Sequence, residues 1–100
     1  MERYEQRQNR FNSVLRATGH ASKLTRQELE KLAQVTARNT LGNVSEMSDA
    51  IVALTTFRNI QGDVFKQTIA LAADARIAFG GNLREGVVAF GKALNEPVAN

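Results

Sequence analysis

The chain has 100 residues, 43% of them hydrophobic, which suits one small domain with a modest core. It contains no cysteine, which excludes disulfides and thiolate metal sites, and its net charge is only +3. The charge is uneven: residues 1–38 hold eight basic and four acidic side chains, a balance of +4, whereas residues 39–100 hold five and six, a balance of −1.

Neither a membrane-spanning helix nor a signal peptide is expected. The most apolar stretch, "IALAADARIAF", is interrupted by Asp74 and Arg76 before it approaches the roughly 18 residues that a span needs. Met1 is followed by "ERYEQRQNR", which is charged where a signal peptide would be apolar.

Glycines mark the expected helix ends, and the segments between them repeat apolar residues at spacings of three and four, as amphipathic helices do. These breaks lie near Gly19, Gly42, Gly62 and the pair Gly80 and Gly81. The first predicted helix, residues 2–18, is polar at its start and apolar later, so its front half is expected to be solvent-exposed.

The next two helices have recognisable starts. "TRQE" has the capping-box form, in which the Thr25 hydroxyl accepts from the amide of Glu28 and the carboxylate reaches back. Ser45 is the expected cap of the third helix, which is predicted to run through Phe57 and to be closed by "RNIQG".

The fourth helix, predicted over residues 63–79, has apolar stripes on two sides, which is typical of a centrally placed helix. Asn82 is a good cap for a fifth helix that contains Gly86 and Gly91. Each interior glycine costs about 1 kcal/mol relative to alanine, and close helix packing is the expected compensation. We expect Gly91 to make such a close approach to the fourth helix and Gly86 to be more exposed.

Together these patterns predict an all-α fold, a compact bundle of four to five short helices, since no segment alternates as a strand would. The predicted core is formed by the apolar residues that repeat on one face of each helix: Leu29, Leu32, Ile51, Leu54, Phe57, Phe65, Ile69, Leu83, Val87, Phe90 and Leu94.

No catalytic or metal-binding constellation is visible in the sequence. His20 is the only histidine, no serine lies in a Gly-x-Ser-x-Gly elbow, and "FGGNLREG" lacks the Lys-Ser or Lys-Thr of a phosphate-binding loop. Asp74 interrupts an apolar helix, and either an exposed position or a contact across helices would explain it. We therefore expect no enzyme activity, no cofactor and no metal.

A small basic helical DNA-binding regulator is the alternative function. In a helix-turn-helix protein, the helix after the Gly42 turn would read the bases, yet residues 45–57 contain Glu46 and Asp49 and no lysine or arginine. That helix has the wrong charge to face phosphates.

The run "FRNIQGDVFKQTIALAADARIAFGGNLREGVVAFGKALNEPVAN" carries a more specific signal. Its ordered motifs are an "F-x-N-I-x-G" turn, an "A-x-D" helix, a "G-x-L"-type turn and a "G-K-A-L-N-E-P" helix end. Together they resemble the tail-length tape-measure proteins of long-tailed phages and prophages, and the likeness covers roughly residues 11–100. The motif positions that are also candidate interface residues are Phe57, Asn59, Ile60, Gly62, Phe65, Asp74, Gly91, Lys92, Ala93, Leu94, Asn95 and Pro97.

The resemblance implies a structural virion component that acts in tail assembly, tail-length determination and genome ejection. It implies a place in the lumen of the tail tube, assembly in the bacterial cytoplasm, and contacts with tail tube subunits, tail assembly chaperones and other copies of the protein. No specific nucleic acid, membrane or small-molecule substrate is expected for this part of such a protein.

The resemblance also predicts how the chain is divided. Residues 1–10 are expected to be a polar helical extension or an added lead-in, and residues 11–100 a helical module excised from a longer tape-measure chain. As one straight helix, such a chain would span about 150 Å, whereas a compact domain of this size has a radius of gyration near 13 Å. The glycine punctuation favours the compact module.

Overall fold

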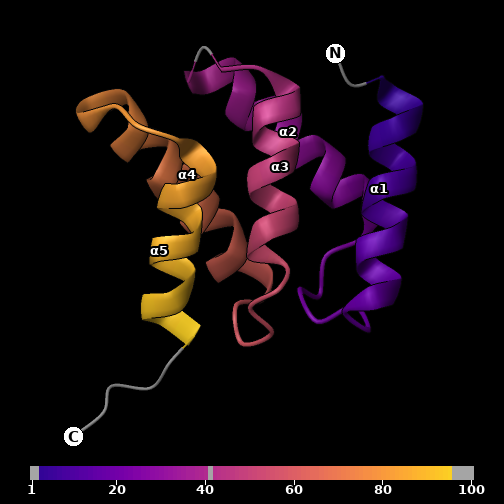
Figure 1. The fold of residues 1–100 in the computed structure, drawn as a ribbon. Coiled ribbons are helices and arrows are strands. Elements are labelled where there is room, and N and C mark those ends of the chain that lie inside the picture. Colours follow the sequence, from indigo (N-terminus) through magenta and orange to yellow (C-terminus); the bar gives the residue numbers. More distant parts are fainter. Residues whose placement is uncertain (1–2, 41, 96–100) are drawn as a thin grey trace, which may run out of the picture.

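A computed structural model describes residues 3–40 and 42–95, which form five helices and no strand. The helices are α1 (Tyr4–Ala17), α2 (Arg26–Thr40), α3 (Val44–Leu54), α4 (Gly62–Phe79) and α5 (Leu83–Asn95) (Figure 1). The radius of gyration is 12.8 Å, the value of a compact domain of this length. The predicted all-α bundle of four to five short helices is confirmed.

Helix α3 is the central element of the bundle, because it contacts each of the other four helices. Helix α1 packs on α2 and α3 at one side, and α4 and α5 pack together at the other (Figure 1). No contact joins α1 to α4 or α5 within the described residues. The α1 end of the module and the end formed by α4 and α5 are therefore connected only through α2 and α3.

Side-chain caps define three of the helix starts. Thr25 and Glu28 form the predicted reciprocal pair, with Glu28 Oε1 accepting from the Thr25 amide at 2.9 Å and Thr25 Oγ1 accepting from the Glu28 amide at 3.1 Å. Asn82 Oδ1 accepts from the amide of Arg84 at 2.8 Å, as predicted for α5. The prediction for α3 is wrong in its residue: Asn43, not Ser45, caps the helix.

The cap of α3 is fixed by spacing along the helix. Asn43 Oδ1 accepts from the amide of Glu46 at 2.6 Å, three residues into the helix, which satisfies one of the free amides of the first turn. Ser45 lies inside this first turn and is therefore too late to serve as the cap.

Helix α3 also ends earlier than predicted, at Leu54, before Phe57. The hydroxyls of Thr55 and Thr56 donate to the carbonyls of Val52 and Ala53, at 2.6 and 2.7 Å. Such hydroxyls compete with backbone amides for helix carbonyls, which favours termination. Residues 55–61 consequently form a loop, and "RNIQG" lies outside the helix.

The core contains most of the predicted residues. Those that are buried as predicted are Leu29, Ile51, Leu54, Phe65, Ile69, Leu83 and Val87. Three others, Leu32, Phe57 and Phe90, are partly buried and pack against this cluster. Leu94 was wrongly assigned to the core, since its side chain is 53% exposed in the last turn of α5.

Two predicted helix environments are also wrong. The front half of α1 is not fully exposed, because Arg7 and Gln8 are buried there. Helix α4 is not central, since its outer face exposes Val64, Leu71 and Ile77 by 48%, 58% and 59%. The central place belongs to α3, which contacts each of the other four helices.

Candidate functional site: two interhelical junctions

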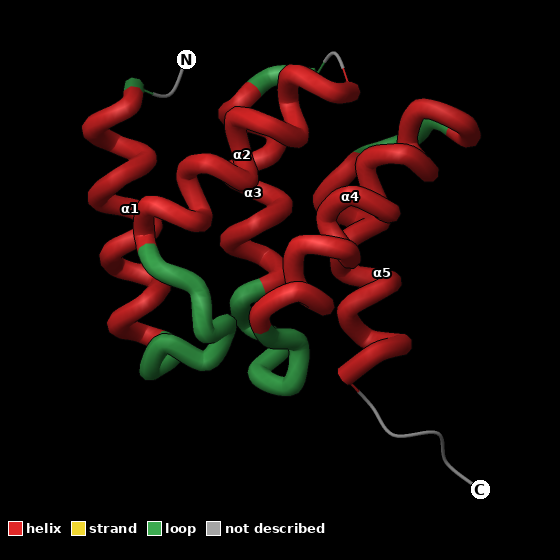
Figure 2. Tube along the Cα trace, turned by 180° about the vertical axis from the view of Figure 1, so that it is seen from behind, coloured by secondary structure: helices red, strands yellow, loops and turns green. Residues whose placement is uncertain are grey.

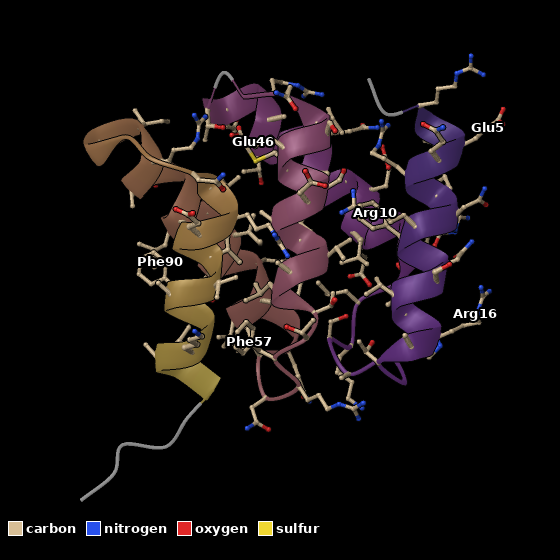
Figure 3. The ribbon with its side chains drawn as sticks, viewed as in Figure 1. Glu5, Arg10, Arg16, Glu46, Phe57 and Phe90 are labelled. Atoms are coloured by element: carbon tan, nitrogen blue, oxygen red, sulfur yellow. The ribbon has the colours of Figure 1, made fainter. Side chains whose placement is uncertain are left out.

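The family-like motifs meet at a contact between α5 and the loop that follows α3. Gly91 is buried, and a Cβ atom built on it would lie 2.6 Å from Cδ2 and from Cε2 of Phe57. That separation is far below van der Waals contact, so the ring can occupy this place only because residue 91 is glycine. Figure 3 shows Phe57 between the loop and the lower half of α5. We call this contact the Phe57–Gly91 junction.

Gly91 thus makes the predicted close approach, but to the loop residue Phe57 rather than to α4. Gly86, one turn earlier, has no atom within 4 Å of a built Cβ and is partly exposed, as expected. Packing therefore leaves no room for a side chain at Gly91, whereas it would allow one at Gly86.

The loop that carries Phe57 is fixed at its other end. Ile60 is 1% exposed, and the amide of Gly62 donates to the carbonyl of Ser22 at 2.8 Å. Ser22 lies in the loop between α1 and α2, so this bond joins that loop to the start of α4, which is far away in sequence (Figure 2). Gly62 has a φ of +55°, a conformation that glycine adopts without strain.

The remaining motif positions divide into buried and exposed residues. Phe65 is fully buried in the first turns of α4. Asn59, Asp74, Lys92, Ala93 and Leu94 are exposed. Asn95 ends α5 but its side chain is not described, and Pro97 lies outside the described residues. The structure therefore brings Phe57, Ile60, Gly62, Phe65 and Gly91 into the body of the module, and leaves the others at its surface.

A second junction, between α1 and α2, is polar. Arg7 donates to Glu30 with Nε at 3.0 Å and Nη2 at 2.8 Å, and the two side chains are each 10% exposed. Gln8 and Gln34 also donate to this carboxylate, at 3.0 and 2.6 Å. The Tyr4 ring lies 5.5 Å from the guanidinium carbon of Arg7. We call this group the Arg7–Glu30 junction.

The environment of Glu30 favours its ionised form. Burial alone would raise the pKa of this carboxyl, but hydrogen bonds from Arg7 and Gln34, the charge of Arg7 and a hydrogen bond from Gln8 outweigh it, so its pKa lies below the ordinary value. The carboxylate thus holds α1 against α2 as an anion. Buried Arg–carboxylate pairs of this bidentate kind have fixed geometry.

Sequence reasoning missed this junction, although a signal was present. Arg7 and Gln8 lie one turn before Phe11 on the stripe that continues to Leu15, and Glu30 adjoins the buried Leu29. Their polarity hid them, because charged residues are seldom fully buried unless they are paired.

Charged side chains near the start of α3 pair with arginines around a surface hollow. A hollow of about 500 Å³ lies where α3 and α5 begin, lined by Asn43, Ser45, Glu46, Asp49, Asn82 and Arg84. Its acids face arginines: Glu46 lies 3.6 Å from Arg76, and Asp49 lies 2.6 Å from Arg10 (Figure 3). Within residues 3–40 and 42–95, no three histidine or acidic side chains gather as a metal site would require.

His20 is exposed in the loop after α1, with a φ of 59°, and its amide donates to the Leu15 carbonyl at 2.8 Å. It therefore takes part in ending the helix through its backbone. No described helix is both long and apolar enough to cross a membrane.

Comparison with known proteins supports the motif assignment. No curated protein sequence and no solved structure matched the chain. One family model matches residues 1–100, the whole chain, and its description is prophage tail length tape measure protein. A tape measure protein is a structural component of the phage tail. The chain belongs to the prophage tail length tape measure protein family.

Proposed function

We propose that this chain is a folded helical module of a tail length tape measure protein, acting in tail assembly, tail-length determination and genome ejection. The observation that carries the proposal is the family match over residues 1–100, together with motifs that lie at the Phe57–Gly91 junction. These motif residues form a packing contact between α5 and the loop after α3, so their role is in the fold of the chain. A structural component needs residues of this kind.

The dimensions define which part of a ruler this module would be. Its extents are 45 × 34 × 19 Å, whereas the same residues as one straight helix would span about 150 Å. In this folded form, the module would therefore add much less to the length of a ruler than the same number of residues in an extended helix. We assign it to a folded part of the ruler rather than to the extended measuring part.

The proposed location is the lumen of the tail tube, after assembly in the bacterial cytoplasm. The proposed partners are tail tube subunits, tail assembly chaperones and other copies of the tape measure protein. Asp74 is a candidate for the contact with another copy, and Lys92 and Leu94 are candidates for the contacts with tube subunits and chaperones, because these side chains are free of the core. Crosslinking followed by mass spectrometry on purified tails would identify which partner each residue meets.

The test of the function is removal of the module in a phage that carries it. Deleting the codons of residues 11–95 should impair tail assembly, or shorten the tail by much less than the roughly 130 Å that these residues would span as one straight helix. Electron microscopy of tail lengths and infectivity measure the outcome. A shortening close to that full length would refute a compact module, and unchanged tails of full infectivity would refute the function.

The DNA-binding alternative makes an opposite prediction. Helix α3 bears no lysine or arginine, and the basic excess lies in residues 1–38, so binding to DNA should be non-specific and fall steeply with salt. Electrophoretic mobility shifts over a range of salt concentrations test this. Sequence-selective binding at physiological salt would favour a regulator instead.

A further inference from the structure

The outer face of α4 holds three of the six large hydrophobic side chains that are exposed among the described residues. The residues exposed along the helix repeat at spacings of three and four, so they form one continuous stripe: Asp63, Val64, Gln67, Ala70, Leu71, Asp74, Ile77 and Ala78. Five of these eight are apolar, including Val64, Leu71 and Ile77, which are each about half exposed or more. A stripe of this kind on a helix of 18 residues is a packing surface that no described element covers.

From this face we infer that the module forms a two-fold symmetric dimer, in which α4 packs antiparallel against α4 of a second copy. Two-fold contacts pair one surface with itself, so the stripe must be complementary to its own reverse. This inference does not depend on the role in the tail, because it rests on the surface of α4 alone.

The stripe meets that condition when the two-fold axis passes beside Ala70 and Leu71. Leu71 then faces Leu71 of the second copy, and Ala70 faces its own equivalent, where small side chains allow the helices to approach closely. On the same side as Leu71, Val64 lies opposite Ala78 of the second copy. Val64 therefore meets a small residue, whereas on the side of Ala70 the pair Ile77 and Asp63 of the second copy lies near each end of the contact.

The polar residues of the stripe are complementary in the same register. Gln67 lies opposite Asp74 of the second copy, and its amide can donate to that carboxylate on both sides of the axis. Lys66, at the edge of the stripe, is level with the same carboxylate, and its side chain is 43% exposed. Lys66 has a weak partner in its own chain, Glu28 at 3.7 Å. Each Asp74 thereby gains a cation and an amide, which accounts for an acid within an apolar helix.

A parallel arrangement lacks this complementarity. It would place each Asp74 beside Asp74 of the second copy and each Asp63 beside its own equivalent, and like charges in contact are unfavourable. The charge pattern thus favours the antiparallel register.

Single cysteines test the register directly, since the natural chain has no cysteine. Leu71→Cys should form a disulfide-linked dimer under mild oxidation, because the residue lies at the two-fold axis. Leu94→Cys is the matched control: this leucine is 53% exposed, against 58% for Leu71, but it lies on α5. Val64→Cys should link to Ala78→Cys when the two chains are mixed, and not to itself.

Self-linked Val64→Cys with no mixed product would overturn the antiparallel register. Equal linking of Leu71→Cys and Leu94→Cys would overturn the assignment to α4, because it would mean random collision.

Sedimentation equilibrium of the 100-residue chain tests association itself. We expect a reversible dimer whose dissociation constant rises about tenfold or more in Leu71→Glu, because that change places two carboxylates at the axis. Leu94→Glu should leave the dissociation constant unchanged. Circular dichroism should show both variants folded, since neither leucine is in the core. A strict monomer at about 1 mM would refute the dimer and leave the tail function untouched.

Discussion

The two junctions of the module hold helices together by opposite means. At the Phe57–Gly91 junction an aromatic ring fills the space of a missing Cβ, so the contact depends on shape. At the Arg7–Glu30 junction a buried carboxylate collects three donor side chains, so the contact depends on charge and hydrogen bonding. We therefore expect the stability of the bundle to depend on pH through its α1 end and on side-chain volume through its α5 end.

Removing the carboxylate should give the largest effect. Glu30→Ala removes the carboxylate to which Arg7 and the two glutamine amides donate, and loss of one partner of a buried ion pair costs about 3–5 kcal/mol. Chemical denaturation would measure the free energy of unfolding. The double variant Arg7→Leu with Glu30→Leu should lose less than Glu30→Ala, because no buried charge then remains; a greater loss would contradict this account.

Gly91→Ala should destabilise the module by less, about 1–2 kcal/mol. The new methyl group would lie 2.6 Å from ring carbons of Phe57, and overpacking of this kind costs about 1–3 kcal/mol, partly offset by the better helix propensity of alanine. Thermal melts would show the change. Phe57→Leu in the Gly91→Ala background should recover part of the loss, and additivity of the two changes would show that the ring is not what opposes the methyl group.

Acid should weaken the Arg7–Glu30 junction. Because the pKa of Glu30 is lower in the folded chain than its ordinary value of 4.5, its contribution is fully present above that value and is lost as the pH falls through the lower, folded pKa. Unfolding free energies measured between pH 7 and about 3 should decline, and the decline should be shallower in Glu30→Gln. Gly91→Ala should show the same pH slope as the natural chain, and a changed slope there would break the contrast between the two junctions.

Gly86→Ala should produce the smallest effect, and it should be stabilising. A Cβ at this position meets nothing within 4 Å, so the change removes backbone freedom from the unfolded chain and improves helix propensity by up to about 1 kcal/mol. A higher melting temperature than that of the natural chain is expected. Any loss of stability would mean that Gly86 lies in a contact after all.

Local sequence signals were sufficient to predict those features that depend on residues within a single helix. The capping box at Thr25, the cap at Asn82 and the apolar periodicity each act within a few residues, so the all-α fold and most of the core followed from them. The end of α3 was harder to locate, because an apolar stripe continued to Phe57 while Thr55 and Thr56 ended the helix.

The sequence by itself determined the helices, their starts at Thr25 and Asn82, the family and the need for close packing at Gly91. Only the tertiary structure decided that the partner of Gly91 is Phe57, that Arg7 and Glu30 form a buried pair, and that α3 rather than α4 is central. The physical reason is the range of the forces involved. Periodicity and capping depend on residues that are close together in the sequence. The packing of the Phe57 ring against Gly91 and the buried ion pair of Arg7 and Glu30 form only when segments that are distant in the sequence come into contact.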